Sequence, residues 1–194
     1  MTLMPMRTLL TVSVLLALAA CPKDPPAESL PSGPASTPAP LLSSGRTAPP
    51  PIAPRAPGLV GDVLDAYDGV HAALARDDAA GAAKSAGALA TAAHGIAVAA
   101  AGPTKQPLTD LAAAAAKLAG AGDLVAARAA FGDVSKDVVA LLVADPALQT
   151  GRFLFLCPMT KGYQKWVQTT VKVENPFFGK EMPDCGEQLK AWSV

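Results

Sequence analysis

The sequence predicts an all-α domain: an up-down antiparallel four-helix bundle with an aromatic- and sulfur-rich C-terminal tail packed on it. Apolar residues recur every three or four positions in four successive stretches between residues 58 and 150, which is the pattern of buried helical faces. Short connections between these stretches favour antiparallel neighbours. At residue 151 the alanine-rich sequence ends, and seven of the nine aromatic residues follow.

The first two helices are predicted from spacing and from their capping residues. The buried face of the first would consist of Val60, Val63, Leu64, Tyr67, Val70 and Leu74. Asp77 or Asp78 can cap the second helix, which Gly102-Pro103 would end. Its inward residues would be Ala82, Ala86, Leu89, Ala93 and Ile96.

The third and fourth helices are predicted from the same two signals, apolar spacing and residues that end or cap a helix. The third would bury Leu108, Leu111, Ala115 and Leu118, and would end at Gly120 and Gly122. Asp123 can cap the fourth, which would close before Pro146. Its apolar face would be Leu124, Ala127, Phe131, Val134, Val138 and Leu141. In the tail, residues 153–156 fit a short strand or the end of a helix, and Asn175-Pro176 and Gly179 indicate turns.

The N-terminus predicts export. Residues 1–20 have one charge, Arg7, followed by an apolar run that ends in small residues, as in a signal peptide. The run is shorter than the roughly 20 residues that a membrane-spanning helix needs. Its end, Leu18-Ala19-Ala20-Cys21, resembles the lipobox of bacterial lipoproteins, which implies lipidation of Cys21 and a membrane anchor. Pro22 follows instead of Asp, so the resemblance implies a periplasm-facing outer-membrane lipoprotein.

Residues 21–57 are predicted to be a disordered tether, because twelve of the 36 residues from 22 to 57 are proline. The bundle would occupy residues 58–150, and the tail, residues 151–194, would belong to the same domain. Sixteen basic residues balance sixteen acidic ones, and the absence of a basic stripe argues against nucleic-acid binding. The sequence has no Ser-His-Asp set, phosphate loop or His-Glu-x-x-His motif, so we expect no enzyme.

Two sulfur pairs in the tail carry the main chemical hypothesis. They are Cys157 with Met159, and Met182 with Cys185. Thiolates and thioethers are soft donors that suit Cu(I) or Ag(I), and the two pairs brought together would offer up to four ligands. His71, on the apolar face of the first helix, is a further candidate ligand.

Each of these residues also has a structural interpretation. Cys157 and Cys185 are an even pair in an oxidising compartment and can form a disulfide, which excludes thiolate coordination while it lasts. The two methionines can fill gaps beside aromatic rings. His71 can be a hydrogen-bonded core residue, and no other cofactor is indicated.

The tail resembles the C-terminal end of an uncharacterised bacterial domain family. The resemblance lies in Cys157-Pro158-Met159, Trp166, residues 175–182 (NPFFGKEM) and Cys185-Gly186, and it covers residues 59–191. That family occurs in exported proteins and lipoproteins, and fused to periplasmic adaptor subunits of copper and silver efflux pumps. The resemblance implies metal handling by the four sulfur residues, with an efflux-pump component as a partner.

Overall fold

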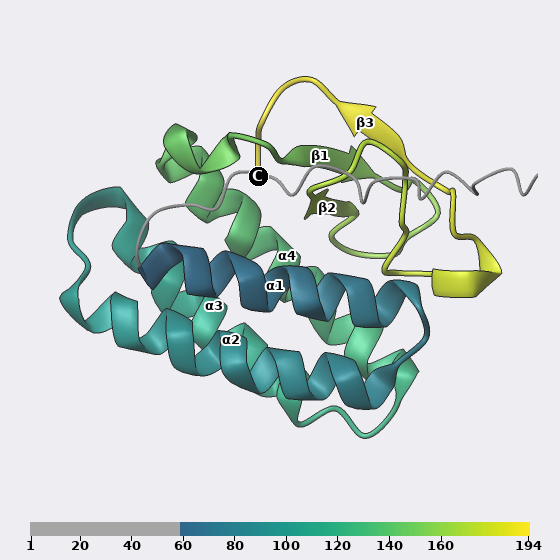
Figure 1. The fold of residues 1–194 in the computed structure, drawn as a ribbon, viewed down its shortest axis with the longest axis horizontal. Helices are drawn as coiled ribbons and strands as arrows, with labels where there is room; N and C mark the ends of the chain where they lie inside the picture. Colours follow the sequence, from purple (N-terminus) through teal and green to yellow (C-terminus); the bar gives the residue numbers. More distant parts are fainter. Residues whose placement is uncertain (1–58) are drawn as a thin grey trace, which may run out of the picture. The chain divides into compact units, whose positions relative to one another are not determined.

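Residues 59–194 are described by a computed structural model, in which four α-helices precede a small antiparallel sheet (Figure 1). The predicted signal peptide, the lipidation site Cys21 and the proline-rich tether lie outside the described residues. Among the helices that are described, none is both long enough and apolar enough to cross a lipid bilayer.

The four helices pack up-down, each against the next in sequence, as predicted. They are α1 (Leu59–Ala75), α2 (Ala79–Ala99), α3 (Lys105–Ala119) and α4 (Leu124–Ala144). Of the two candidate caps for α2, Asp78 is the one used: its carboxylate accepts the Gly81 N–H at 2.8 Å. Asp123 caps α4 in the same way through the Ala126 N–H, also at 2.8 Å. A short 3₁₀ turn, Gly102–Thr104, leads into α3.

The bundle core follows the predicted helical faces closely. Small side chains on α2 and α3, including Ala82, Ala86 and Ala115, are fully buried and allow neighbouring helices to approach closely. Three residues predicted to point inward are only half-buried, namely Val60, Ile96 and Leu124. Each lies in the first or last turn of its helix, where fewer neighbours cover it.

The C-terminal segment corrects the all-α prediction, because the chain is mainly helical with a three-stranded antiparallel sheet. The strands are β1 (Phe153–Leu156), β2 (Lys165–Gln168) and β3 (Glu187–Leu189), with β1 in the centre. Two further 3₁₀ turns are Pro146–Gln149 and Gly179–Glu181. Residues 153–156 therefore form a strand, and its partners come from distant, very short segments that show no periodicity of their own.

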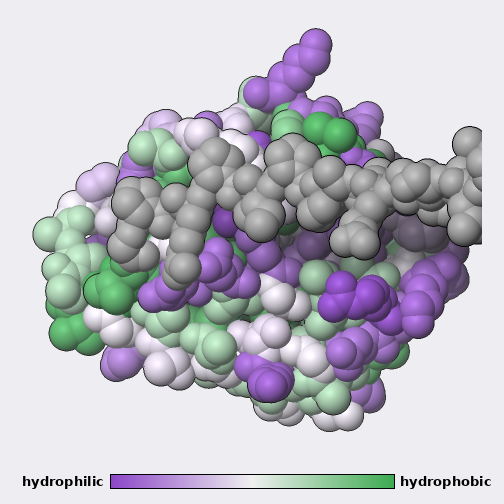
Figure 2. Space-filling view, viewed as in Figure 1, coloured by the Kyte–Doolittle hydropathy of each residue, from purple (hydrophilic) through white to green (hydrophobic). Residues whose placement is uncertain are grey.

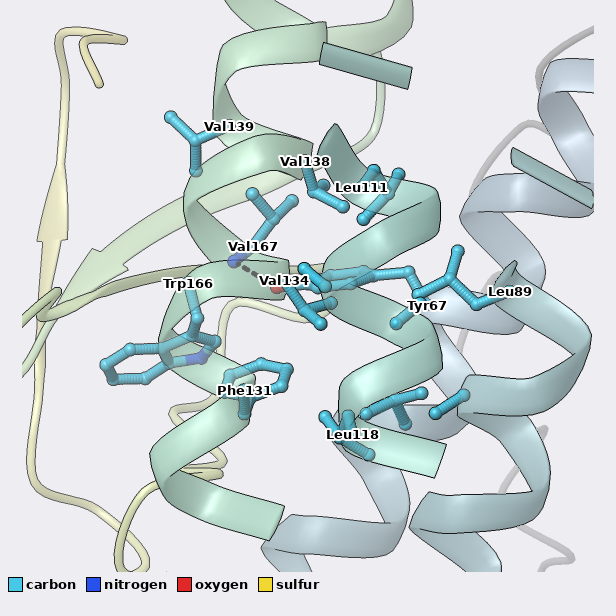
Figure 3. Close-up of a cluster of buried hydrophobic side chains, with 14 of the residues drawn as sticks. Tyr67, Leu89, Leu111, Leu118, Phe131, Val134, Val138, Val139, Trp166 and Val167 are labelled. Carbon is cyan, nitrogen blue, oxygen red and sulfur yellow. Dashed lines mark hydrogen bonds between the residues drawn. The ribbon is translucent and has the colours of Figure 1, made fainter. Parts of the chain in front are cut away.

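An aromatic cluster joins the sheet to the bundle. Trp166 of β2 and Phe131 of α4 both pack against the ring of Phe177, with centroids 6.0 and 5.3 Å apart. Tyr67 stacks on Phe131 from the opposite side of the core, at 5.9 Å. Figure 3 shows the Tyr67 side chain reaching across the bundle to the backbone of Val167, whose N–H it accepts at 3.1 Å. The tail is therefore continuous with the bundle core.

Candidate functional site: the Cys157–Cys185 pair

Cys157 and Cys185 lie at adjoining ends of two paired strands. Cys157 follows β1 directly, and Cys185 precedes β3 by two residues in a register that sets Leu156 opposite Glu187. Their Sγ atoms are 2.9 Å apart. This separation exceeds the roughly 2.05 Å of a disulfide bond, and both residues are free thiols. The fold thus brings into contact two sulfurs that are 28 positions apart in sequence.

The two thiols have different environments. Cys157 is fully buried and Cys185 is half-buried. Burial opposes ionisation of Cys157, but hydrogen bonds to its sulfur outweigh that effect and lower its pKa. The donors are the Cys185 thiol, the Met159 N–H, the Thr160 hydroxyl and the Asn175 side chain. The hydrogen bond with Cys157, together with burial and the neighbouring negative charge, raises the pKa of Cys185 to about 11. The pair therefore favours a thiolate on Cys157 and a proton on Cys185.

A tight turn after β1 shapes the thiolate environment. The Thr160 N–H donates to the Cys157 carbonyl at 3.2 Å, and the Cys157 N–H donates to the Gln164 carbonyl at 3.0 Å. The buried Thr160 hydroxyl lies in the same turn and is among the groups that lower the pKa of the Cys157 thiol.

Cys185 belongs to a loop, here called the Cys185 loop (residues 175–186), which links the aromatic cluster to β3. Asn175, at its start, is fully buried and donates its amide Nδ2 to the Cys185 carbonyl at 2.7 Å. The Asn175 Oδ1 accepts the N–H groups of Phe177 and Phe178 at 2.8 and 3.1 Å. One side chain therefore connects the first turn of the loop to the residue that carries the second sulfur.

The same loop is anchored to the helices at Gly179. Arg128 of α4 donates to the Asp77 carboxylate at 2.5 Å and to the Pro176 carbonyl at 3.2 Å. Asp77 also accepts the Lys180 N–H at 3.3 Å. Gly179 has φ +55°, and a Cβ there would lie 2.0 Å from Asp77 Oδ1 and 2.2 Å from Arg128 Nη2. Only glycine permits this approach without displacing the ion pair.

The other ligands predicted from the sequence, Met159, Met182 and His71, differ in their exposure to solvent. Met159 is 62% exposed, although its N–H faces the Cys157 sulfur. Met182 is half-buried, and its carbonyl accepts the Cys185 N–H at 3.3 Å. His71 is buried, and its Nε2 donates to the Glu174 carbonyl at 2.8 Å. Burial lowers the pKa of His71 and so favours the neutral imidazole, in which the Nε2 hydrogen is already donated to Glu174.

Soft donors are the chemically distinctive feature of this site. Within residues 59–194 no group of three or more His, Cys, Asp and Glu side chains could hold a metal ion, and the two thiols are a pair of soft donors in contact. Two such thiols can coordinate one soft ion as thiolates or can close a disulfide. Both reactions start from the same contact between the two sulfurs.

The fold and site together define a helical bundle with a thiol pair at the edge of an appended three-stranded sheet. Residues 63–150 match the model of a family described as a protein of unknown function, DUF3347. The match covers most of the bundle and ends before Cys157. No curated protein and no solved structure matches the chain.

Two residues next to the cysteine pair, Asn175 and Thr160, were not identified from the sequence as part of the candidate site. Asn175-Pro176 was predictable as a turn, and an Asn before a turn is a signal for side-chain capping of the following N–H groups. Its hydrogen bond to Cys185 was not predictable, because that partner lies beyond the turn. Thr160 carries no sequence signal beyond its closeness to Cys157.

Proposed function

We propose that this protein is an envelope lipoprotein that captures a soft monovalent ion, Cu(I) or Ag(I), at Cys157 and Cys185, as an accessory to metal efflux or homeostasis. The observation that carries the proposal is the contact between two reduced sulfurs at 2.9 Å. Thiolates prefer soft ions to hard ones. The resemblance of the tail to domains fused to copper and silver efflux adaptors supports the same role.

Ionisation of the pair supports a ligand role as well. A metal-binding cysteine must lose its proton, and Cys157 is the sulfur whose pKa is lowered. Cys185 has a pKa of about 11, so its proton would leave when the ion binds. Binding would therefore strengthen as pH rises, because each thiol that coordinates the ion must release its proton.

Met159 and Met182 are the proposed additional ligands. Met159 is largely exposed two residues after the buried thiol, a position from which a thioether can meet an incoming ion first. Met182 lies next to the Cys185 turn. In this proposal, an ion passes from Met159 to the two sulfurs, and a partner in the efflux machinery removes it by exchanging ligands.

An anaerobic titration of the reduced protein with Cu(I), in competition with a chromogenic Cu(I) chelator, tests the proposal. We expect one tightly bound ion per chain, lost in Cys157→Ser and in Cys185→Ser. Met159→Leu and Met182→Leu should each weaken binding by a smaller factor. His94→Gln removes an exposed imidazole of α2 and serves as the control, with wild-type affinity. A wild-type protein that takes no ion from the chelator would rule out the proposal.

The second candidate is a non-metal envelope interaction module with a structural Cys157–Cys185 disulfide. The same sulfur contact favours it, because two thiols already in contact oxidise readily in an oxidising compartment. A bond across this loop would stabilise the chain by about 3 to 4 kcal/mol on the entropic model. Thiol counting on protein purified from cells without reductant distinguishes the two: two free thiols favour the ion site, and none favours the disulfide.

Membrane attachment is a separate part of the proposal. The sequence Leu18-Ala19-Ala20-Cys21 supports lipidation at Cys21, and Pro22 supports sorting to the periplasmic side of the outer membrane. Metabolic labelling with a radioactive fatty acid should label the wild-type chain and leave Cys21→Ser unlabelled. Label in Cys21→Ser would exclude this anchor.

A further inference from the structure

We propose that Asn175 is the positioning residue of the cysteine pair: its buried carboxamide fixes the Cys185 loop so that the Cys185 sulfur stays against the Cys157 sulfur. This inference rests on the proposed role of the pair as a thiol site. It concerns how the two sulfurs are held together, whatever ion or oxidant they meet.

The Asn175 side chain is buried, and both its nitrogen and its oxygen make hydrogen bonds. Its exposed fraction is 0%. Nδ2 donates to the Cys185 carbonyl at 2.7 Å, and Oδ1 accepts the Phe177 and Phe178 N–H groups at 2.8 and 3.1 Å. The side chain thus restrains the backbone of the residue that carries the second sulfur.

The backbone of Asn175 strengthens the same arrangement. Its N–H donates to the Pro183 carbonyl at 3.0 Å, and its carbonyl accepts the Gly179 N–H at 2.9 Å. The preceding carbonyl, that of Glu174, accepts His71 Nε2 from α1 at 2.8 Å. Asn175 therefore links both halves of the Cys185 loop at a point that is itself tied to the bundle.

Few residue types could replace Asn175. The site requires a donor and an acceptor on one short, neutral side chain. Asp keeps the acceptor for the two N–H groups, loses the donor to the Cys185 carbonyl and the Cys157 sulfur, and adds a charge, while Ala loses every contact without adding one. The two variants are therefore compared: Asn175→Asp leaves the turn bonds in place, and Asn175→Ala removes the links to the cysteines without a new charge.

The Asp77–Arg128 anchor provides a matched control on the same loop. It holds Gly179 and Lys180 against α1 and α4 and makes no described hydrogen bond to either cysteine. Asp77→Asn weakens this anchor without changing Asn175. If loop anchoring in general positioned the sulfurs, both variants would have the same effect.

The test is the equilibrium of the metal-free protein with glutathione buffers. One oxidised glutathione accepts two electrons from the dithiol, the Cys157–Cys185 bond forms, and two reduced glutathione molecules carry away the two protons. We expect Asn175→Asp and Asn175→Ala to lower this equilibrium constant about tenfold, as the loss of a buried hydrogen bond predicts. Asp77→Asn should stay within about twofold of the wild type.

Equal constants for the wild type and Asn175→Asp would overturn the proposal. A measurement on the wild-type chain covers the case in which both variants fail to fold: the Asn175 side-chain amide protons should exchange with solvent as slowly as core backbone amides. Rapid exchange of those protons would also overturn it. A wild-type protein that binds no copper would remove the proposed function and leave this result unchanged.

Discussion

Gly179 shows how one residue fixes the position of the Cys185 loop. Its φ of +55° lies in the left-handed region, and a Cβ would meet the Leu74 carbonyl at 3.0 Å as well as the Asp77–Arg128 ion pair. We predict that Gly179→Ala lowers the free energy of unfolding by about 2 kcal/mol, measured by urea denaturation. Gly95→Ala is the control, because a Cβ on that exposed α2 glycine meets nothing within 4 Å. It should stabilise the chain by about 0.5 to 1 kcal/mol.

The hydroxyl of Tyr67 links α1 to the backbone of β2 by hydrogen bonds. It accepts the Val167 N–H at 3.1 Å and donates to Ser135 Oγ at 3.1 Å, and Ser135 donates to the Lys165 carbonyl at 2.9 Å. Tyr67→Phe would leave a buried strand N–H without its partner, so we predict a loss of about 1 to 2 kcal/mol in urea denaturation. A Tyr67→Phe protein as stable as the wild type would show that the hydroxyl contributes only packing.

The elements differ in how far the sequence predicted them. The four helices were predictable because each carries its own repeat and its own cap, as Asp78 and Asp123 show. The sheet was not, because β1 has only four residues and pairs with two later segments of four and three residues, too short to show a period of their own. In the same way, the sulfur residues were identifiable as candidates by type, while the 2.9 Å contact came from strand register.

A group of carboxylates on α3 and α4 predicts that the stability of the domain depends on pH. Partial burial and the carboxylates of Asp110 and Asp133, opposed by Lys136, raise the pKa of Asp137 from 3.8 to about 6. Because the folded-state pKa is the higher one, Asp137 contributes stability below about pH 4 that is lost as pH rises through about 6.

We therefore predict that Asp137→Asn stabilises the chain at pH 7.5 by about 1 kcal/mol, a value reduced for solvent screening. The gain should shrink towards zero near pH 4, as followed by urea denaturation across the range. Asp184→Asn, at an exposed loop position, should change little at any pH. A gain for Asp137→Asn that does not depend on pH would contradict the titration account.

At the scale of the whole molecule, the surface of the bundle shows little that points to a function. Exposed large apolar residues come from separate segments, among them Leu59, Val98, Val125 and Val171. Figure 2 shows hydrophilic and hydrophobic residues interspersed over the face in view. Isolated apolar residues of this kind are normal on a surface. The soft chemistry of the cysteine pair is therefore a stronger indication of function than the surface of the helices.

Because the two thiols join β1 to the Cys185 loop, their chemical state should set the stability of the whole domain. Cu(I) at about 1,000 times its dissociation constant would add about 4 kcal/mol to the reduced protein, which corresponds to a rise in Tm of roughly 10 to 15 °C for a domain of this size. Oxidised protein should melt higher than reduced protein and should not respond to Cu(I), since disulfide sulfurs are no longer thiolates. Calorimetry on both forms, with and without the ion, checks each expectation. An equal Tm rise in the oxidised form would place the ion somewhere other than the cysteine pair.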